Sequence, residues 1–355
     1  MKKQVPIIMI GPDINGLGGI SRVVRIFRDS GLFDELCIRY VSSTTDMDVN
    51  RLFFLLRGII SFLTKIVQPG SVVYIHTSSY KSFYRKSVFI CLAILFNNKC
   101  VLHIHPSHFY EFLVSLKGIR RKFVHYLIRR MKIIIVLTDA MKERMNSLFP
   151  ASDIQVLRNP VPFKKMENRN NIRRSANRFL YLGWYIREKG VYELVDAIEM
   201  LVSRGLDIHL EYFGTKQIDA LRKYVEIKKL EKRIMVNGWI DDIEKIDKLY
   251  QCTALILPSH SEGIPNVILE AMSTKTPIIS TKVGGLKEVL KDRKNALVVN
   301  VNDPSDLSEK ISFCLHEKEL SKKMADYAYK EAKTKYEINI IKNRFKQIIE
   351  PITQL

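Results

Sequence analysis

Short runs of Val, Ile and Leu alternate with amphipathic stretches along the whole chain. Near-continuous apolar runs separated by helical stretches are typical of parallel strands that are buried on both faces. In the first half, this pattern predicts strands at 6–12, 36–42, 71–77, 100–106, 132–139 and 153–159. It also predicts helices near 19–30, 51–67, 83–97, 109–131 and 139–148.

A polar and basic stretch with two prolines, residues 159–178, interrupts the alternation and predicts a linker. The alternation then restarts, with predicted strands at 179–184, 208–214, 234–240, 254–259, 277–282 and 296–300. Helices are expected near 190–204, 217–230, 242–251, 265–274 and 286–290, and the tail from Pro304 is helical, with a last segment near 337–350.

These elements predict an α/β protein with two doubly wound, Rossmann-like domains that face a cleft. We expect the first domain in residues 1–160, the linker in 161–178 and the second domain in 179–335. The helix within 336–355 is expected to pack back on the first domain. Ligands of such sheets bind at the carboxyl ends of the strands.

Composition narrows the class of protein. The 355 residues carry a net charge of +20, which attracts nucleic acid, an anionic membrane or a phosphorylated substrate. The five cysteines are scattered and lack metal-ligand spacing, so we expect reduced core residues of a cytoplasmic protein. The apolar run before Gly11 is too short for a signal peptide, and no run approaches the roughly 20 residues of a membrane span.

The segment SEGIPNVILE, residues 261–270, has the pattern of an anion site. It follows an apolar strand and begins a helix, whose N-terminal amides and dipole favour a phosphate. Glu262 precedes the helix and Glu270 lies one turn past Asn266 on the same face. Two carboxylates that accept hydroxyl groups on either side of an anion site fit a nucleotide sugar, whereas the alternative is a dipole-favoured acid and a surface charge.

Residues 260–285 closely resemble the E-x7-E signature of retaining nucleotide-sugar glycosyltransferases of the GT-B fold, the large family 4 group. The resemblance implies that Glu262 contacts the transferred sugar and that Glu270 binds the ribose. It also implies that the backbone of the residues between them holds the phosphate, namely Gly263, Ile264, Pro265 and Asn266. In that family the second domain binds the donor and the first domain handles the acceptor.

Other motifs extend the resemblance. INGLGGISRV resembles the family's glycine-rich first loop, with Gly18 and Gly19 at the start of a helix. VNGWID resembles the loop that touches the nucleobase, which implies base contacts at Trp239 and Ile240.

The stretch YLGWYIREKG resembles the family's GRL-x-x-EKG stretch and implies that Lys189 neutralises the donor phosphate. Trp184 stands where the family usually has Arg, so Arg187 is a candidate to reach the same anion from a shifted position. The alternative is that Trp184 packs and Arg187 is solvated.

Three histidines occur in LHIHPSHF, residues 102–109. His103 and His105 alternate on a predicted strand and share a face, but carboxylates and thiols are missing nearby, so we predict that they bind no metal. The resemblance implies that His105 hydrogen-bonds the transferred sugar, with His108 as second choice and His103 structural.

The resemblance implies a hexosyltransferase-type reaction with retention of configuration and front-face attack by the acceptor hydroxyl. The donor would be a UDP- or GDP-linked sugar, and the acceptor a saccharide or a lipid-diphosphate-linked sugar. Positioning and charge neutralisation by Lys189 and the helix amides would replace a metal, so we expect neither metal nor other cofactor.

Residues 117–132 carry seven Lys or Arg and no acid, with Ile119, Phe123, Leu127 and Met131 at helical spacing. This pattern favours a basic amphipathic helix on anionic lipid, although a helix with one core face and one solvated basic face has the same pattern. We therefore predict a protein at the inner face of the cell membrane that acts in cell-surface polysaccharide or glycolipid assembly.

Three alternatives remain open from the sequence. A nucleic-acid binder would explain the charge, but the chain lacks a nucleic-acid-binding motif, and we expect no nucleic-acid partner. A nicotinamide-dependent oxidoreductase would suit doubly wound domains, but GLGGIS lacks the G-x-G-x-x-G spacing. A non-catalytic GT-B scaffold that binds a nucleotide sugar would explain Trp184.

Overall fold

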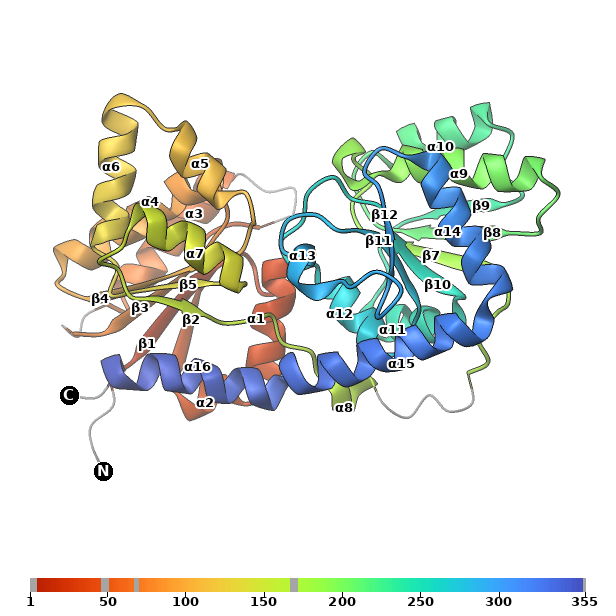
Figure 1. Ribbon diagram of the computed structural model, residues 1–355. Coiled ribbons are helices and arrows are strands. Elements are labelled where there is room, and N and C mark those ends of the chain that lie inside the picture. Colours follow the sequence, from red (N-terminus) through yellow and green to blue (C-terminus); the bar gives the residue numbers. More distant parts are fainter. Residues whose placement is uncertain (1–4, 46–50, 67–69, 167–171, 354–355) are drawn as a thin grey trace. The chain divides into compact units, whose positions relative to one another are not determined.

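The computed structural model describes residues 5–45, 51–66, 70–166 and 172–353. These residues divide into two compact units, 1–160 with 336–355 and 161–335. Each unit contains a six-stranded sheet among the described residues, and all of the paired strands are parallel (Figure 1). The predicted α/β class with two doubly wound sheets is confirmed.

The sheet of the first unit has the order β2-β1-β3-β4-β5-β6. Its strands are β1 (Ile7–Gly11), β2 (Ile38–Ser42), β3 (Val72–Thr77), β4 (Lys99–Ile104), β5 (Ile133–Val136) and β6 (Ile154–Val156). The helices are α1 (Gly19–Asp29), α2 (Leu32–Glu35), α3 (Arg51–Leu63), α4 (Lys81–Leu95), α5 (Phe109–Ser115), α6 (Gly118–Arg129), α7 (Asp139–Leu148) and α16 (Ile338–Thr353). Strands β1 and β3 are buried throughout, as their unbroken apolar runs predict.

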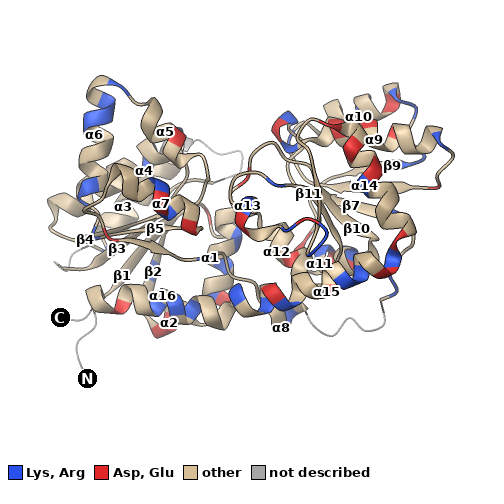
Figure 2. Ribbon diagram, viewed as in Figure 1, with Lys and Arg blue, Asp and Glu red and all other residues tan. Residues whose placement is uncertain are grey.

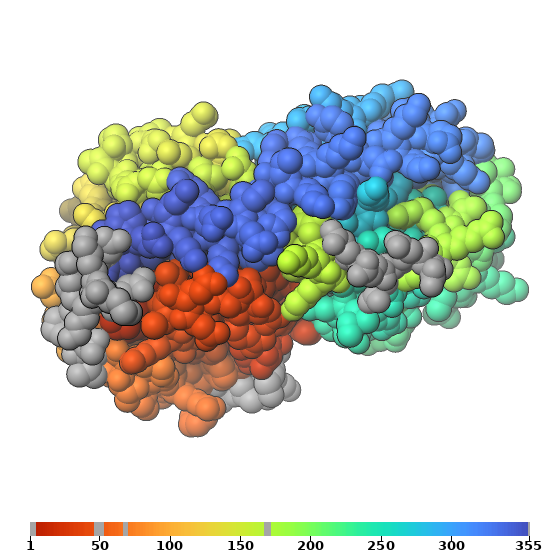
Figure 3. All heavy atoms as spheres, turned by 90° about the horizontal axis from the view of Figure 1, so that it is seen from below, coloured from red at the N-terminus to blue at the C-terminus, as the bar shows by residue number. Residues whose placement is uncertain are grey.

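The C-terminal helix α16 packs into the core of the first unit. Ile341, Phe345 and Ile349 are buried in a cluster with β1, β3 and α1, and the Phe345 ring lies 5.2 Å from that of Tyr74. The segments of α1 and α16 lie side by side in Figure 3. The expected return of the C-terminal helix to the first half of the chain is therefore present.

The sheet of the second unit has the order β12-β11-β10-β7-β8-β9. Its strands are β7 (Arg178–Leu182), β8 (His209–Phe213), β9 (Ile234–Asn237), β10 (Ala254–Leu257), β11 (Ile278–Thr281) and β12 (Leu297–Val299). Its helices are α8 (Phe163–Met166), η1 (Arg187–Lys189), α9 (Val191–Ser203), α10 (Ile218–Ile227), α11 (Asp242–Gln251), α12 (Asn266–Ser273), α13 (Leu286–Val289), α14 (Pro304–His316) and α15 (Lys318–Lys335).

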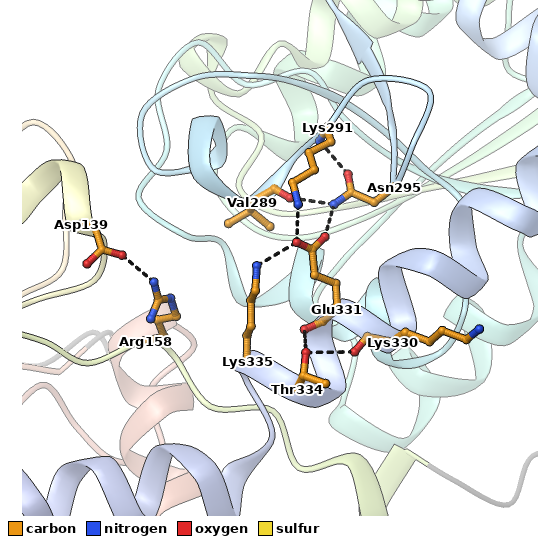
Figure 4. Close-up of polar contacts among 9 residues, drawn as sticks. All are labelled: Asp139, Arg158, Val289, Lys291, Asn295, Lys330, Glu331, Thr334 and Lys335. Carbon is orange, nitrogen blue, oxygen red and sulfur yellow. Dashed lines mark hydrogen bonds and ion pairs between the residues drawn. The ribbon is translucent and has the colours of Figure 1, made fainter.

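Polar contacts attach α15 to the second unit. Glu331 accepts hydrogen bonds from Lys291 at 2.6 Å, Lys335 at 2.8 Å and Asn295 at 2.8 Å (Figure 4). The bonds from Lys291 and Asn295 join α15 to the segment between α13 and β12, whereas the bond from Lys335 lies within α15. Figure 4 also draws Asp139 and Arg158, which pair at 2.7 Å in the first unit.

Several local predictions need correction. The helix expected at 109–131 is two helices, because the chain is extended at Leu116 and Lys117 and Gly118 has a φ of +53°. The predicted linker contains α8, whose Phe163 and Met166 are buried, and residues 167–171 lie outside the described residues. Cys37 and Cys91 are exposed, so only three of the five cysteines are core residues.

Candidate functional site

The loops that follow β7 and β10 meet at the carboxyl edge of the second sheet. The strand order reverses direction between these two strands, and such a switch point is where doubly wound sheets bind ligands. The His260 amide donates to the Glu188 carbonyl at 2.9 Å and joins the loops. Gly190 has a φ of +68°, and a Cβ there would lie 2.2 Å from the Pro258 carbonyl oxygen. Glycine is therefore required for the close approach of the two loops.

Lys189 and Glu262 are brought together by this approach. The Lys189 Nζ lies 2.6 Å from Oε1 of Glu262, and the Ser259 hydroxyl donates to the same oxygen at 2.7 Å. Both charged side chains are largely shielded, with 22% and 11% of their surface exposed. The predicted phosphate and sugar contacts of the sequence thus form one charged, hydrogen-bonded group at the switch point.

A third loop fixes the peptide after Glu262. The Gly285 amide donates to the Glu262 carbonyl at 3.1 Å, and a Cβ on Gly285 would lie 2.4 Å from the carbonyl oxygen of Gly263. The backbone then enters α12 at Asn266. Pro265 is the N-cap of α12 and has an extended backbone, so it lies one position before the first helical turn. The sequence had predicted that the helix begins at residue 265.

The predicted phosphate cradle, Gly263 to Asn266, therefore occupies the N-terminal end of α12. Ile264 is buried, whereas Gly263, Pro265 and Asn266 retain partial exposure. A helix N-terminus carries a partial positive charge and directs amide groups outward, so this end of α12 suits an anion.

Glu270 lies within α12 and is buried, with 3% of its side chain exposed. Its Oε1 accepts a hydrogen bond from Lys245 of α11 at 2.9 Å, and Lys245 also pairs with Asp242 at 3.0 Å. The alternative of a surface charge is therefore wrong for Glu270. A buried carboxylate that is held by a lysine is a positioned hydrogen-bond acceptor.

Two exposed tryptophans follow strands β7 and β9 of the same sheet, which are separated by β8. Trp184 comes two residues after β7, and its carbonyl accepts a hydrogen bond from Tyr181 at 2.9 Å. The Lys216 Nζ lies 5.6 Å from the centre of the Trp184 ring, a cation–π contact. Trp239 comes two residues after β9 and is half exposed, while the adjacent Ile240 is buried. Both rings thus lie at the carboxyl edge of the sheet.

Arg187 is exposed at the start of η1. It lines a cavity of about 560 Å³ together with Glu188, Glu193, His260, Asn302 and Pro304. The cavity borders the loop that carries Glu262, because His260 is two residues before it. Arg187 is thus placed beside the site, but within the part of the chain that is described it forms no hydrogen bond or ion pair with Lys189 or Glu262.

The remaining predicted residues, Gly18, Gly19 and His105, belong to the first unit. Gly18 caps α1 and Gly19 begins it, in a loop that follows β1. The Ser21 hydroxyl donates to the Asp13 carbonyl at 2.7 Å, and Arg25 donates to the Gly16 carbonyl at 2.9 Å. The glycine-rich loop is therefore a compact turn before a helix N-terminus, as the motif predicts.

His105 follows β4 and contacts a histidine that the sequence reading missed. Nδ1 of His76 lies 2.8 Å from Nε2 of His105, and Nδ1 of His103 lies 2.8 Å from the Tyr74 hydroxyl. Burial lowers the pKa of His105 to about 3, and the charge of Lys86 adds to this effect. His105 is therefore neutral near pH 7. One ring nitrogen from each of the three histidines lies within 4.8 Å of the other two. The prediction of no metal, which was made without His76, therefore considered only part of the cluster.

The structure adds three residues to the candidate site. Ser259 holds Glu262, Lys245 holds Glu270, and His76 holds His105. A sequence signal existed for His76, because its predicted strand is adjacent to that of His103 and ends in a similar apolar run. Lys245 and Ser259 carry no such signal, since only the packing of α11 on α12 and the course of the loop bring them to the acids.

Comparison with solved structures places the fold. The structure of HepE from Anabaena with UDP and glucose covers 97% of this chain and 99% of its own, with a TM-score of 0.76 at 15% identity. Sucrose-phosphate synthase from Thermosynechococcus elongatus covers 98% of this chain and 99% of its own, with a TM-score of 0.80 at 16% identity. The two parallel sheets and these likenesses define the GT-B fold.

Sequence comparison finds a family that matches part of the chain. Residues 162–331 match the family described as "Glycosyl transferases group 1". An uncharacterised glycosyltransferase of Methanocaldococcus jannaschii is 29% identical over 66% of this chain, and the capsular polysaccharide biosynthesis glycosyltransferase CapM of Staphylococcus aureus is 23% identical over 64%. The match spans 65% of the length of each of these two relatives. Residues 162–331, just under half of the chain, therefore carry the sequence pattern of the group 1 glycosyltransferases.

Proposed function

We propose that this protein is a retaining, metal-independent glycosyltransferase that uses a nucleotide-sugar donor. The observation that carries the proposal is the group at the switch point of the second sheet. There, Lys189 lies 2.6 Å from Glu262, directly before the N-terminus of α12 and one helical turn from the buried Glu270. A cation, a helix N-terminus and two acceptor carboxylates match a diphosphate that is flanked by two hydroxyl-bearing sugars.

Each group has one role in this proposal. Lys189 and the amides of α12 stabilise the charge that develops on the departing diphosphate. Glu262 accepts hydrogen bonds from the transferred sugar and Glu270 from the ribose. The base contacts Trp239 and Ile240, largely through backbone. Lys189 must exchange part of its contact with Glu262 for the phosphate, so donor binding reorganises this ion pair.

The groups of the first unit complete the proposed chemistry. His105 hydrogen-bonds the transferred sugar and Gly18 and Gly19 allow backbone to approach the donor. The acceptor hydroxyl attacks from the face of the departing phosphate, which takes its proton, so positioning and charge stabilisation are the work of the protein. Neither a metal nor another cofactor is required for this route.

The names of the relatives support a pathway for the proposed reaction. CapM is described as a capsular polysaccharide glycosyltransferase, and TuaC of Bacillus subtilis, 27% identical over 44% of this chain and 38% of its own length, as a putative teichuronic acid glycosyltransferase. The HepE structures contain UDP, UDP-glucose or UDP with glucose. These names support a UDP-linked donor and a saccharide acceptor in cell-surface polysaccharide assembly. A GDP-linked donor, a lipid-diphosphate-linked acceptor and glycolipid assembly are proposed from the sequence resemblance alone.

Exposed apolar and basic residues of the first unit support attachment to an anionic membrane at the inner face of the cell membrane. Ile119 of α6 is 83% exposed and is followed directly by Arg120, Arg121 and Lys122. Figure 2 shows the basic positions of α6 in blue. Leu127 and Met131, by contrast, are buried and belong to the core. The apolar residues that were predicted to form one membrane-facing stripe are therefore partly exposed and partly in the core. On α3, an exposed stripe at helical spacing consists of Phe53, Leu56, Ile60 and Leu63.

The attachment is peripheral in this proposal. In the part of the chain that the structure describes, no helix combines the length and hydropathy that a membrane crossing requires. Basic side chains beside apolar ones are the features of a helix that lies in the interface of an anionic membrane. In this proposal, the net positive charge of the chain attracts anionic lipid and phosphorylated ligands. We propose no nucleic-acid partner.

Trp184 favours one alternative, a scaffold that binds a nucleotide sugar without transfer. The residue stands at the position of the family's usual Arg, and its ring contacts Lys216. In the catalytic proposal, Lys189 and the α12 amides suffice for the diphosphate, with Arg187 as a supplementary cation.

A thermal-shift screen of UDP- and GDP-sugars with and without a chelator tests the proposal. A donor at 100 times its Kd would stabilise the folded chain by about 2.7 kcal/mol. We expect one donor to raise the Tm equally with and without chelator, and then to be consumed when an acceptor is added. Stabilisation without consumption would favour the scaffold, and stabilisation that requires a divalent ion would contradict metal independence.

A further inference from the structure

Three histidines form a buried cluster on one face of the first sheet. His76 of β3 pairs in register with His103 of β4, and His105 lies two residues further along, so their side chains share a face. The relative exposures are 0%, 1% and 9%, so only His105 reaches the surface. The rings of His103 and His105 lie 4.1 Å apart, and those of His76 and His105 lie 5.1 Å apart.

The tautomers of His76 and His105 are coupled by the hydrogen bond between them. Nδ1 of His76 lies 2.8 Å from Nε2 of His105, so one nitrogen carries the proton and the other accepts it. Desolvation by burial lowers the pKa of both imidazoles, most strongly that of His76, and both are neutral near pH 7. Each ring therefore carries a single proton.

The buried surroundings of Nε2 of His76 determine which ring nitrogen donates the hydrogen bond between His76 and His105. Among the described residues, no hydrogen-bond partner lies within reach of the buried Nε2 of His76. A buried N–H without a partner is less tolerable than a bare lone pair, so Nε2 of His76 is the unprotonated nitrogen. The proton of His76 is then on Nδ1 and is donated to Nε2 of His105. His105 must carry its own proton on Nδ1.

A shared metal is a less suitable explanation of the cluster. Two nitrogens bound to one tetrahedral zinc at about 2.0–2.1 Å lie about 3.3 Å apart. The separation of 2.8 Å between His76 and His105 is shorter than this and is the length of a hydrogen bond. Lys86, which is buried in α4, also adds positive charge near His76 and His105.

We propose that His76 is a positioning residue that holds His105 as the Nδ1–H tautomer, so that His105 presents a hydrogen-bond donor to the transferred sugar. The second half of this statement rests on the proposed function, in which His105 contacts the sugar. Nε2 of His105 is occupied by His76, so Nδ1 is the remaining ring nitrogen for a ligand. Such a partner fixes both the ring orientation and the tautomer, as the orienting acid does for a catalytic histidine.

Nuclear magnetic resonance of the ¹⁵N-histidine-labelled chain tests the tautomer without any substrate. The couplings of the ring nitrogens to Hδ2 and Hε1 identify the protonated nitrogen, and His105→Gln assigns the His105 signals by their loss. We expect Nδ1 of His105 to be protonated in the wild type. Protonation at Nε2 would overturn the inference, and the couplings themselves are measured on the wild-type chain.

Variants separate positioning from simple packing. His76→Leu should release His105 to the Nε2–H tautomer and lower kcat/KM about tenfold, the factor that one lost hydrogen bond of about 1.4 kcal/mol gives. His76→Asn retains an N–H donor and should keep the Nδ1–H tautomer and most of the activity. Tyr74→Phe, which removes the partner of His103, is the matched control and should leave the tautomer of His105 unchanged.

The outcomes also separate this inference from the proposed function. An unchanged tautomer in His76→Leu, or zinc that is retained by the wild type and lost from His76→Leu, would overturn the role of His76. Absence of transfer in the wild type with every donor would contradict the proposed function, while the tautomer measurement would still decide the positioning role.

Discussion

Lys189 and Glu262 form an ion pair between the loops after β7 and β10, with Nζ 2.6 Å from Oε1. The two residues are 73 positions apart in the chain, and the contact depends on a left-handed Gly190 beside Pro258. Lys189 and Glu262 are each other's ion-pair partners, so the proposed diphosphate must compete with Glu262 for Lys189. The ion pair therefore holds the Lys189 side chain in the site and keeps it oriented before the donor binds.

Replacement of Lys189 tests the phosphate role. Lys189→Ala should lower kcat/KM by about 100- to 1,000-fold, because one preorganised charge for the leaving group is lost. The free energy of unfolding should also fall, because Glu262 is 11% exposed and keeps only the Ser259 hydroxyl as a partner of Oε1. The fall should be smaller than for the loss of a lysine beside the more deeply buried Glu270. Steady-state kinetics and urea unfolding measure the two effects. Lys322→Ala, an exposed lysine of α15, is the control, and full activity in Lys189→Ala would remove the assigned role.

The pair of Lys245 and Glu270 predicts a different balance between stability and function. Lys245→Ala leaves a carboxylate that is 97% buried without its lysine, a loss that typically costs about 3–5 kcal/mol. We expect a large fall in the free energy of unfolding together with a raised KM for the donor. Lys228→Ala, whose partners Asp196 and Glu199 are more exposed, should cost at most about 1 kcal/mol. Equal losses in the two variants would refute a buried, positioned Glu270.

The sequence predicted the fold well because parallel strands that are buried on both faces give unbroken apolar runs. Such runs at residues 7–11 and 72–77 required no knowledge of their partners. The prediction from sequence failed at 109–131, where the apolar spacing continues through a break between two helices at Gly118. Periodicity records which positions are apolar, whereas a change of helix direction at an extended pair of residues leaves that spacing intact.

The candidate site was predictable only in part. Glu262 and Glu270 lie on one short segment, so a motif of ten residues identifies them together. Lys245 and His76 come from other elements, and their contacts follow from the packing of α11 on α12 and from the register of β3 with β4. Long-range packing such as that of Lys245 has no local sequence signal, whereas His76 lies near the end of a predicted strand that precedes the strand of His103.

A buried lysine in the first unit gives a pH-dependent stability. Burial lowers the pKa of Lys86 from its usual value of 10.5 to about 7, and the charge of Arg85 adds to the effect. Between pH 7 and 10.5 the unfolded chain binds the proton that the folded chain has lost, so stability rises with pH in this window. Below pH 7 the full penalty of the buried lysine is present.

Lys86→Met should therefore be more stable than the wild type near pH 7, and the difference should shrink as pH rises to 10.5. The expected slope of the difference is at most about 1.4 kcal/mol per pH unit. Urea unfolding of both proteins across this range measures it. Lys117→Met, at an exposed position, should follow the wild-type profile. A constant difference between Lys86→Met and the wild type would show that Lys86 keeps its ordinary pKa.

The exposed face of α6 predicts binding to anionic lipid. The wild-type chain should co-sediment with vesicles that contain anionic lipid and much less with neutral vesicles, and salt should weaken the binding. Arg120→Ala with Lys122→Ala should reduce the binding constant about fivefold per charge, because each basic residue near the surface contributes about 1 kcal/mol.

The apolar part of this surface can be tested separately. Ile119→Ser, at a side chain that is 83% exposed in α6, should weaken binding at high salt, where the electrostatic contribution is screened. Ile227→Ser on α10 of the second unit, 66% exposed, is the matched control for an exposed isoleucine. Because both positions are exposed, neither change should alter the Tm appreciably. Equal binding to neutral and anionic vesicles, or equal effects of the two serine variants, would reject α6 as the membrane-binding element.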